Sequence, residues 1–337
     1  MNKKILLTGG AGYIGTHIAI ELINKNYDVV IVDNLSNSNK ESVNRIPKIT
    51  GKKPKLYIFD VQNARKLDEV FKENKIDSVV HLAGLKAVGE SVRKPLEYYE
   101  NNLYSSINLF KTMLVNGVKK LVFSSSATVY GDPQYLPIDE NHPITPTNPY
   151  GHTKAKIEQI LKDLAISNDG WKITSLRYFN PIGAHKSGLV GENPNGSPNN
   201  LVPFVSRVAV GKLEKVMIFG DDYDTKDGTG VRDYIHVVDL ARGHVSAIEK
   251  PAAENVCNVY NLGTGKGYSV LDAINKFKKA SGRDIAYEVT KRRPGDIATC
   301  YADPSKANTE LAWKANMGLQ EACEDEWRWQ SNNPNGY

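Results

Sequence analysis

The chain has 337 residues, of which 40% are hydrophobic and 24% are charged, a mix typical of a globular protein with one large or two smaller cores. Its formal net charge of +5 is spread along the sequence without a long basic run, so a nucleic-acid-binding tail is not expected. The widely spaced Cys257, Cys300 and Cys323 suit neither a disulfide framework nor a zinc site. No apolar segment approaches the length of a membrane span. We therefore expect a cytoplasmic protein with no bound metal and no membrane partner.

The N-terminal segment predicts a dinucleotide-binding unit. An apolar strand over residues 3–8 runs into a glycine-rich loop at Gly9–Gly15, and apolar residues then recur at helical spacing to about residue 26. A second strand over 27–33 ends in Asp33. In this context the glycines let the backbone approach a pyrophosphate at the helix N-terminus, and Asp33 accepts hydrogen bonds from the adenosine ribose. Because no arginine directly follows Asp33, the predicted cofactor is NAD rather than NADP.

Strands and helices continue to alternate, which predicts an α/β fold with a doubly wound parallel sheet of the Rossmann type. We expect further elements in this region as strands near 56–59, 78–83, 120–126 and 172–178, and helices near 64–74, 96–116 and 149–168. Ligands bind beyond the carboxyl ends of such strands. Asp60, Gly84 and Ser124–Ser126 lie there and are therefore candidate site residues.

The composition changes after Tyr178, where residues 181–200 are rich in Gly, Pro and Asn. The expected elements beyond this connection are strands near 215–220 and 259–262 and helices near 237–249, 269–281, 304–312 and 318–330. We predict an NAD-binding domain over residues 1–180, to which residues of about 234–262 return. A smaller α/β domain over 181–337 is predicted to bind the substrate.

A helix start at Asn148–Lys154 carries the first candidate for catalysis. Asn148 is a good helix cap, and Pro149 suits the first helical position. Tyr150 and Lys154 then lie at i and i+4 on one helix face, where the ammonium favours the phenolate and lets the tyrosine act as a base. Such a pair is common in helices by chance. Ser126, at the end of the preceding strand, and the predicted cofactor site give this pair a catalytic setting.

Together, these features resemble the extended short-chain dehydrogenase/reductase superfamily, and the tract at residues 176–181 does so too. Three longer stretches resemble one family within it, the UDP-galactose (UDP-glucose) 4-epimerases: residues 83–92, 124–131 and 227–236. The similarity runs from residue 3 to Tyr337.

The resemblance implies a UDP-hexose 4-epimerase with bound NAD and a transient 4-keto sugar. Tyr150 would be the base, Lys154 would lower its pKa and hold the nicotinamide ribose, and Ser126 would hydrogen-bond the sugar hydroxyl. The implied cofactor-binding residues are Gly9, Gly12, Tyr13, Ile14, Gly15, Asp33, Asn34, Asp60, Val61, Leu82, Ala83, Gly84, Lys86, Asn101, Ser124, Tyr150, Lys154 and Tyr178. The implied substrate-binding residues are Lys86, Ser126, Tyr150, Asn180, Asn200, Leu201, Phe219, Arg232, Arg293, Asp296 and Cys300.

Within that substrate set, Arg232 and Arg293 would bind the pyrophosphate, because arginine offers forked donors. Asp296 would hold the uridine ribose, and Phe219 would lie against the uracil. The resemblance also suggests a homodimer formed through the helices near 96–116 and 149–168.

Cys300 departs from the family pattern. In members restricted to glucose and galactose, the matching position tends to be a tyrosine that closes the space around the 2-substituent of the sugar. A thiol is much smaller, so we predict that UDP-GlcNAc and UDP-GalNAc are accepted as well. A slip of one residue in the match would make Tyr301 the wall instead, although the preceding Arg293–Asp296 segment argues against it.

Other readings remain open. An epimerase restricted to UDP-Glc and UDP-Gal is the nearest. A 4,6-dehydratase of the same superfamily usually has an Asp-Glu pair after the active-site hydroxyl, whereas Ser126 is followed here by Ala127 and Thr128. A reductase would need exchangeable NADPH, which Asp33 opposes, and a non-catalytic NAD sensor would have no use for the Ser–Tyr–Lys set.

Overall fold

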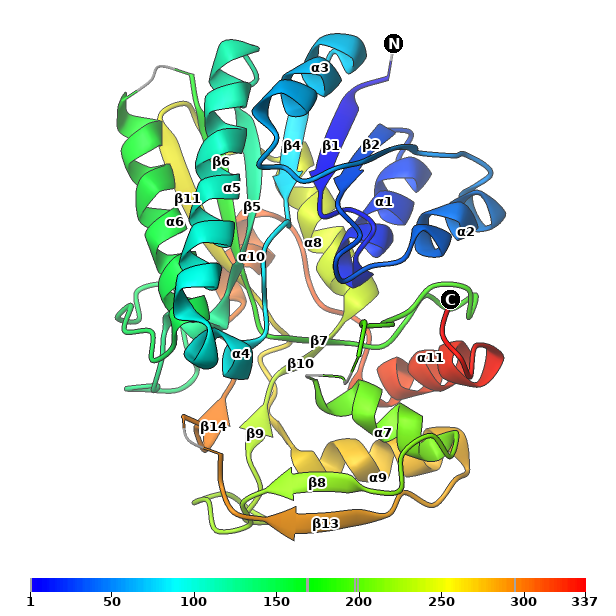
Figure 1. Ribbon diagram of the computed structural model, residues 1–337. Helices are drawn as coiled ribbons and strands as arrows, with labels where there is room; N and C mark the ends of the chain where they lie inside the picture. The colour runs from blue at the N-terminus through cyan, green and yellow to red at the C-terminus, as the bar shows by residue number, and fades with distance from the viewer. Residues whose placement is uncertain (1, 168–169, 197, 199, 294) are drawn as a thin grey trace.

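The structure is a computed structural model that describes residues 2–167, 170–196, 198, 200–293 and 295–337. Predicted positions 168, 197, 199 and 294 lie outside the described residues. Within the described chain, seven parallel strands form the central sheet, in the order β11-β6-β5-β4-β1-β2-β3 (Figure 1). Their bounds are β1 (Lys4–Thr8), β2 (Asp28–Asp33), β3 (Lys55–Ile58), β4 (Ser78–His81), β5 (Lys120–Ser126), β6 (Lys172–Tyr178) and β11 (Val256–Leu262).

The strands form where the sequence is apolar without alternation, because a parallel sheet is buried on both faces. In β2, for example, residues 29–33 are all buried. The strand order reverses between β1 and β4, which are hydrogen-bonded neighbours although they are far apart in sequence. Such a switch point leaves a crevice at the carboxyl ends of the two strands.

Helices cover both faces of this sheet (Figure 1). One face packs against α1 (Tyr13–Asn24), α2 (Lys40–Thr50) and α8 (Val237–Glu249). The other face packs against α3 (Ala64–Asn74), α5 (Pro95–Val115) and α6 (Pro149–Ser167), with α4 (Val88–Arg93) beside α5. The short 3₁₀ helix η1 (Ala127–Val129) follows β5 directly.

A smaller unit lies below the carboxyl ends of the sheet in Figure 1. Its strands are β7 (Asn180–Ile182), β8 (Val216–Phe219), β9 (Val231–Arg232), β10 (Tyr234–His236), β12 (Tyr268–Ser269), β13 (Tyr287–Thr290) and β14 (Thr299–Cys300). Its helices are α7 (Leu201–Ala209), α9 (Val270–Ser281) and α11 (Leu319–Asn332), while α10 (Ser305–Glu310) packs beside β11. A separate core that includes Val205, Ile218 and Phe277 holds this unit together.

The predicted fold class is confirmed by the parallel sheet and its two helical layers. Strand β11 pairs with β6, and α8 packs against α1, so these two elements belong to the central sheet and its helical layer. The division near residue 180 stays a proposal. In the described part of the chain, none of the helices has the length and apolar character needed to cross a membrane.

Candidate active site

A cavity of about 570 Å³ lies along the carboxyl ends of the strands, at the switch point between β1 and β4. Every residue predicted to bind the cofactor, from Gly9 to Tyr178, lies in its lining. Segments that are far apart in sequence therefore meet where the order of the strands predicts a ligand crevice.

The glycine loop fits a dinucleotide phosphate. Gly9 has a φ of +72°, and a Cβ there would lie 2.8 Å from the backbone N of Ala83. A Cβ on Gly15 would lie 2.6 Å from Gly10 Cα, so the helix and the loop pack too closely for a side chain. Helix α1 begins at Tyr13, and its N-cap, Gly12, has no side chain that could cap the helix. The N–H groups of its first turn are thus open to an anion.

Asp33 is held at the rim of this cavity by neighbouring donors. Its Oδ2 accepts a hydrogen bond from the N–H of Ala11 at 3.0 Å, and its Oδ1 accepts from Leu35 N and Ser38 Oγ, both at 2.8 Å. The lining residues that follow it, at positions 34 and 36–39, are all uncharged asparagines and serines. This wall suits a ribose with free hydroxyls better than one with a 2′-phosphate.

Helix α6 presents Tyr150 and Lys154 to the cavity. Asn148 Oδ1 accepts a hydrogen bond from Gly151 N at 2.9 Å, as expected of a cap. Gly151 is required at the start of the helix, because a Cβ there would lie 2.7 Å from the carbonyl oxygen of Thr128. Lys154 Nζ donates to the carbonyl oxygen of Ser124 at 2.6 Å and lies 5.8 Å from the centroid of the Tyr150 ring.

The charges of this pair differ from the expectation. Burial raises the pKa of Tyr150 to about 12, although its hydrogen bond with Ser126 lowers it. Burial also lowers the pKa of Lys154 to about 8, against the opposing effect of Glu158. The predicted lowering of the tyrosine pKa by Lys154 is therefore not met in the chain alone, because the ammonium is directed at the Ser124 carbonyl. Phenolate formation then needs further positive charge beside the ring.

Ser126 ends β5 and does not line the cavity itself, but its hydroxyl is aligned by its neighbours. Its Oγ accepts hydrogen bonds from Thr128 N at 3.2 Å and from Thr128 Oγ1 at 2.9 Å. It is also the register partner of Tyr178 in β6. The hydroxyl is therefore held at the end of β5, next to the strand that carries Tyr178.

The remaining predicted substrate residues form a second group, in and around the smaller unit. The guanidinium of Arg293 lies 4.5 Å from the Phe219 ring centroid, and its Nε pairs with Asp296 Oδ2 at 2.9 Å. Arg232 and Cys300 are register partners in β9 and β14.

Glu192 connects this group to the cavity and was not anticipated from the sequence. Its carboxylate accepts from Lys86 Nζ at 3.2 Å and from Asn200 Nδ2 at 3.1 Å, and Leu201 then begins α7. The other predicted substrate residue, Asn180, begins β7, and its N–H donates to the Asp233 carbonyl at 2.9 Å. Glu192 therefore links Lys86 of the cavity wall to Asn200 through the chain's own hydrogen bonds.

Further lining residues were missed by sequence reasoning: Ala11, Val32, Ser36, Asn37, Ser38, Asn39, Leu85, Ala87, Glu90, Arg93, Tyr98, Ser105, Gly191, Glu192, Asn193, Pro194, Asn195 and Tyr337. The polar run after Asp33 could have signalled the members at 36–39. The segment at 191–195 has no local signal. It is placed by distant contacts, since Asn195 Nδ2 donates to Ser36 O at 3.0 Å and Tyr337 Oη donates to Gly191 O at 3.1 Å.

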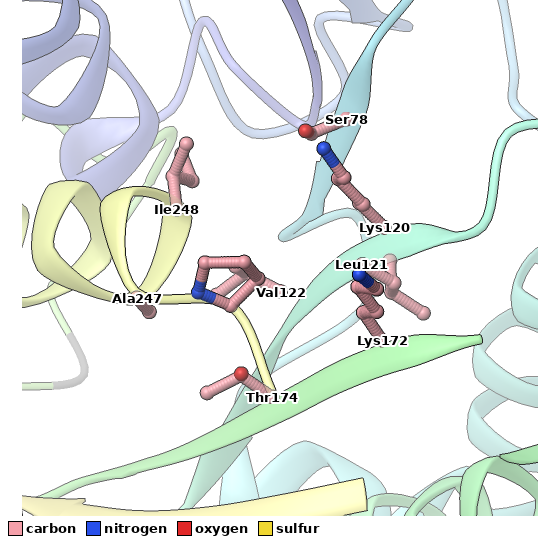
Figure 2. Close-up of a pocket in the computed structure, with 9 residues that line it drawn as sticks. Ser78, Lys120, Leu121, Val122, Lys172, Thr174, Ala247 and Ile248 are labelled. Atoms are coloured by element: carbon pink, nitrogen blue, oxygen red, sulfur yellow. The ribbon is translucent and has the colours of Figure 1, made fainter. Parts of the chain in front are cut away.

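A second cavity lies at the opposite end of the sheet (Figure 2). It is bordered by the amino-terminal residues of β4, β5 and β6, among them Ser78, Lys120 and Lys172, and by the end of α8. Its volume is about 10 Å³, enough for about one water molecule, so it has no room for a substrate. Among the described residues, no group of three or more His, Cys, Asp or Glu side chains is placed to hold a metal ion.

The sheet, the glycine loop and the Ser126–Tyr150–Lys154 set define an extended short-chain dehydrogenase/reductase. A family model described as GDP-mannose 4,6 dehydratase matches residues 6–326. The chain is 59% identical over 333 residues to a UDP-glucose 4-epimerase of Bacillus subtilis (strain 168), covering 99% of this chain and 98% of that protein. It is 53% identical over 342 residues to the mouse UDP-glucose 4-epimerase, covering 99% of each.

Solved structures agree with these relatives. The UDP-glucose 4-epimerase from Bifidobacterium longum, in complex with NAD⁺ and UDP, superposes with a TM-score of 0.97 at 56% identity, covering 99% of this chain and 100% of that one. An epimerase from Stenotrophomonas maltophila with bound NAD and formylated UDP-arabinopyranose gives 0.96 at 46% identity, covering 99% of each chain. The chain belongs to the UDP-glucose 4-epimerase family.

Proposed function

We propose that the chain is an NAD-dependent isomerase that interconverts UDP-glucose and UDP-galactose through a transient 4-keto sugar. The observation that carries this proposal is the Ser126–Tyr150–Lys154 set at the edge of a cavity shaped for a dinucleotide. NAD, when bound, accepts a hydride from carbon 4 of the sugar and returns it. Dehydration is disfavoured, because Ala127 and Thr128 stand where dehydratases carry their acidic pair.

The chain's own residues transfer the proton of the sugar 4-hydroxyl. Tyr150 takes the proton from the 4-hydroxyl and later gives it back, which is the work of a general base and acid. Ser126 holds the same hydroxyl by hydrogen bonding. Lys154 holds the nicotinamide ribose and supplies positive charge, and it is 5% exposed, so that charge acts in a poorly screened environment.

The smaller unit is proposed to bind the UDP part of the substrate. Arg232 and Arg293 supply forked donors for the pyrophosphate. Phe219 lies under the Arg293 guanidinium and is proposed to contact the uracil, and Asp296 to hold the uridine ribose. Because Arg293 is paired with Asp296 in the chain alone, substrate binding exchanges part of that ion pair for phosphate contacts.

We further propose that UDP-GlcNAc and UDP-GalNAc are substrates, because Cys300 leaves room for the N-acetyl group. Cys300 is 8% exposed and packs in one cluster with Val129, Phe179 and Ala127. Ala127 and Val129 follow Ser126 directly, so the thiol lies on the side of the site where the sugar hydroxyl is held. Burial raises the pKa of the thiol to about 11, and it acts as a small neutral group.

The decisive experiment is to incubate the purified protein separately with UDP-Gal and UDP-GalNAc and to resolve the products. Conversion of both is expected. If neither is converted, the epimerase proposal is wrong, and if only UDP-Gal is converted, the proposal for Cys300 is wrong.

Cys300→Tyr tests the size argument. We expect kcat/KM on the N-acetylated pair to fall at least about tenfold, equivalent to about 1.4 kcal/mol, because the phenol ring fills the space of the 2-substituent. Activity on UDP-Gal should change much less. Cys300→Ser, which keeps the size of the side chain, serves as the control and should retain both activities. Equal losses on both sugar pairs in the tyrosine variant would contradict the argument.

A homodimer is proposed through α5 and α6, with the short helix α4 beside α5. Val92 is 61% exposed and Leu96 80% exposed, and Tyr104 is also exposed on α5, so these helices present apolar side chains to solvent in the single chain. Leu96→Glu should shift the molecular mass from dimer to monomer in light scattering across a concentration series. Met217→Glu, an exposed apolar position on β8, should leave the mass unchanged. A monomeric mass for the unsubstituted protein would contradict the proposal.

We also propose a functional division of the chain near residue 180, in which the part before it holds NAD and the part after it holds the UDP-sugar. The separate core of the smaller unit supports this division. A reducing cytoplasmic location is supported by the free thiols of Cys257, Cys300 and Cys323.

A further inference from the structure

Helix α6 is fixed to the end of β5 by three side chains spaced one helical turn apart: Tyr150, Lys154 and Glu158. The Ser126 hydroxyl acts on Tyr150 and lowers its pKa, and Lys154 Nζ donates to the carbonyl oxygen of Ser124 at 2.6 Å. Ser125, which lies between Ser124 and Ser126 in β5, completes the set, since its Oγ donates to Glu158 Oε1 at 2.6 Å. Each of the three consecutive residues Ser124–Ser126 of β5 thus has a partner on a different turn of α6.

Glu158 is itself held in place by a buried network. Arg177 Nε donates to Glu158 Oε1 at 2.9 Å, and Arg177 Nη2 donates to Oε2 at 2.6 Å. Arg177 is the register partner of Ser125 in the neighbouring strand, and Ser175 Oγ donates a weaker bond at 3.3 Å. The side chains of Arg177 and Glu158 are only 2% and 3% exposed, so this is a fully desolvated, bidentate ion pair.

The network extends to the loop beyond Ser126. Arg177 Nη1 donates to Tyr130 Oη at 2.9 Å, and that hydroxyl donates to Asn261 Oδ1 at 2.6 Å. Asn261 Nδ2 in turn donates to the carbonyl oxygen of Ile138 at 2.9 Å. The carboxylate of Glu158 therefore lies at the centre of a set of bonds that joins β5, β6, β11 and α6.

A buried ion pair adds little net stability, because desolvation of the two charges offsets their attraction. Apolar side chains of similar size would hold α6 to the sheet at least as well. We propose that Glu158 is instead a positioning residue for the Tyr150 base, which fixes the position of α6 relative to Ser124–Ser126. The inference rests on the proposed epimerase function.

The charges around Lys154 and Glu158 support this role. Burial favours neutral Lys154, and the Glu158 carboxylate acts against that effect. The other titratable or charged groups linked to this pair are His81 of β4, Tyr150 on the same helix, Arg177 of β6 and Cys257 of β11. Tyr98 of α5 and Tyr178 of β6 interact electrostatically with Tyr150. Burial lowers the pKa of His81 to about 3 and raises the pKa values of the three tyrosines and the thiol, so these groups are neutral near pH 7. Glu158 is then the anion that offsets the cost of burying the lysine charge.

Glu158→Gln tests the proposal in the NAD-loaded protein. The change keeps the shape of the side chain and removes its charge. We expect kcat on UDP-Gal to fall about tenfold or more, with KM and NAD content within about twofold of the unsubstituted protein. The alkaline limb of the kcat profile should move to lower pH by about one unit, because Lys154 loses its proton more readily without the carboxylate.

A second variant separates positioning from stability, since Glu158→Gln leaves Arg177 buried without its partner. The double variant Glu158→Gln/Arg177→Met removes both charges and should recover the melting temperature. If Glu158 positions the base, this variant still has a low kcat and a shifted alkaline limb. Recovery of kcat and of the pH profile together with the melting temperature would overturn the proposal.

Asp239→Asn is the matched control, because Asp239 is a buried carboxylate on α8 that pairs with Arg242 away from Lys154. It should lower the melting temperature without moving the pH profile. A Glu158→Gln profile that coincides with that of the unsubstituted enzyme would also refute the inference. If the unsubstituted protein converts no UDP-sugar, it is the proposed function that fails.

Discussion

Replacing Tyr150 by phenylalanine is expected to lower kcat for UDP-galactose by about 10²–10⁴-fold, the usual contribution of a positioned general acid–base group. The phenol is the group proposed to exchange a proton with the sugar, and the Ser126 hydroxyl acts to lower its pKa. The ring itself remains, so the cavity keeps its shape and the NAD content after purification should be unchanged. Product formation and released nucleotide can be measured on the same sample.

A matched control is available in Tyr260→Phe. Tyr260 is a buried tyrosine of β11 whose hydroxyl donates to Glu310 at 2.8 Å, away from the cavity. That variant should lose some stability but keep its kcat. Turnover within about tenfold of the unsubstituted enzyme in Tyr150→Phe would remove Tyr150 from the base role.

Lys154→Met should reduce turnover by a similar factor and at the same time stabilise the fold. Burial lowers the lysine pKa from its ordinary value of 10.5 to about 8, which corresponds to about 3 kcal/mol of unfavourable free energy at pH 7. Methionine avoids this cost but leaves the Ser124 carbonyl without its donor, which costs about 1 kcal/mol. The free energy of unfolding should therefore rise by about 2 kcal/mol while activity is lost.

The gain in unfolding free energy expected for Lys154→Met is largest at low pH and is lost as pH rises. Below about pH 8 the lysine is charged in both the folded and the unfolded state. The unsubstituted protein then bears the full cost of burying the charge, and the variant has its largest gain in unfolding free energy. As pH rises from about 8 toward 10.5, the native state releases its proton first and the advantage disappears. Lys162→Met, at an exposed lysine on the same helix, should show no such gain. Denaturant unfolding at pH 7 and pH 10 measures both effects, and a destabilised Lys154→Met protein at pH 7 would contradict the argument.

The sequence predicted the central sheet well because its strands are continuous apolar runs that end at polar or glycine residues. It did not reveal α2, which carries Pro47 and buries few apolar side chains, notably Val43 and Ile46. Helix α7 and the short strands β9 and β14 were also missed. A strand of two residues has no periodicity to detect and exists only because β9 and β14 pair in the folded chain.

The residues of the site likewise fall into those that the sequence predicted and those that it did not. Residues of the glycine loop, Asp33 and the Tyr150 helix were predicted because each belongs to a local motif whose chemistry depends on spacing. Glu192 belongs to no motif, and its role in joining Lys86 to Asn200 follows from tertiary packing alone. The same is true of Glu158, whose place beside Ser125 depends on how α6 is docked onto β5.

The wall of the cofactor cavity is formed in part by Gly9, near one end of the chain, and in part by Tyr337. Tyr337 reaches the cavity because its hydroxyl bonds to Gly191 and its ring lies under the Arg45 guanidinium, at 5.0 Å. The complete cavity therefore forms only when segments that are far apart in the sequence have folded together. A nucleotide that binds only this assembled cavity adds its binding free energy to the resistance of the enzyme to unfolding.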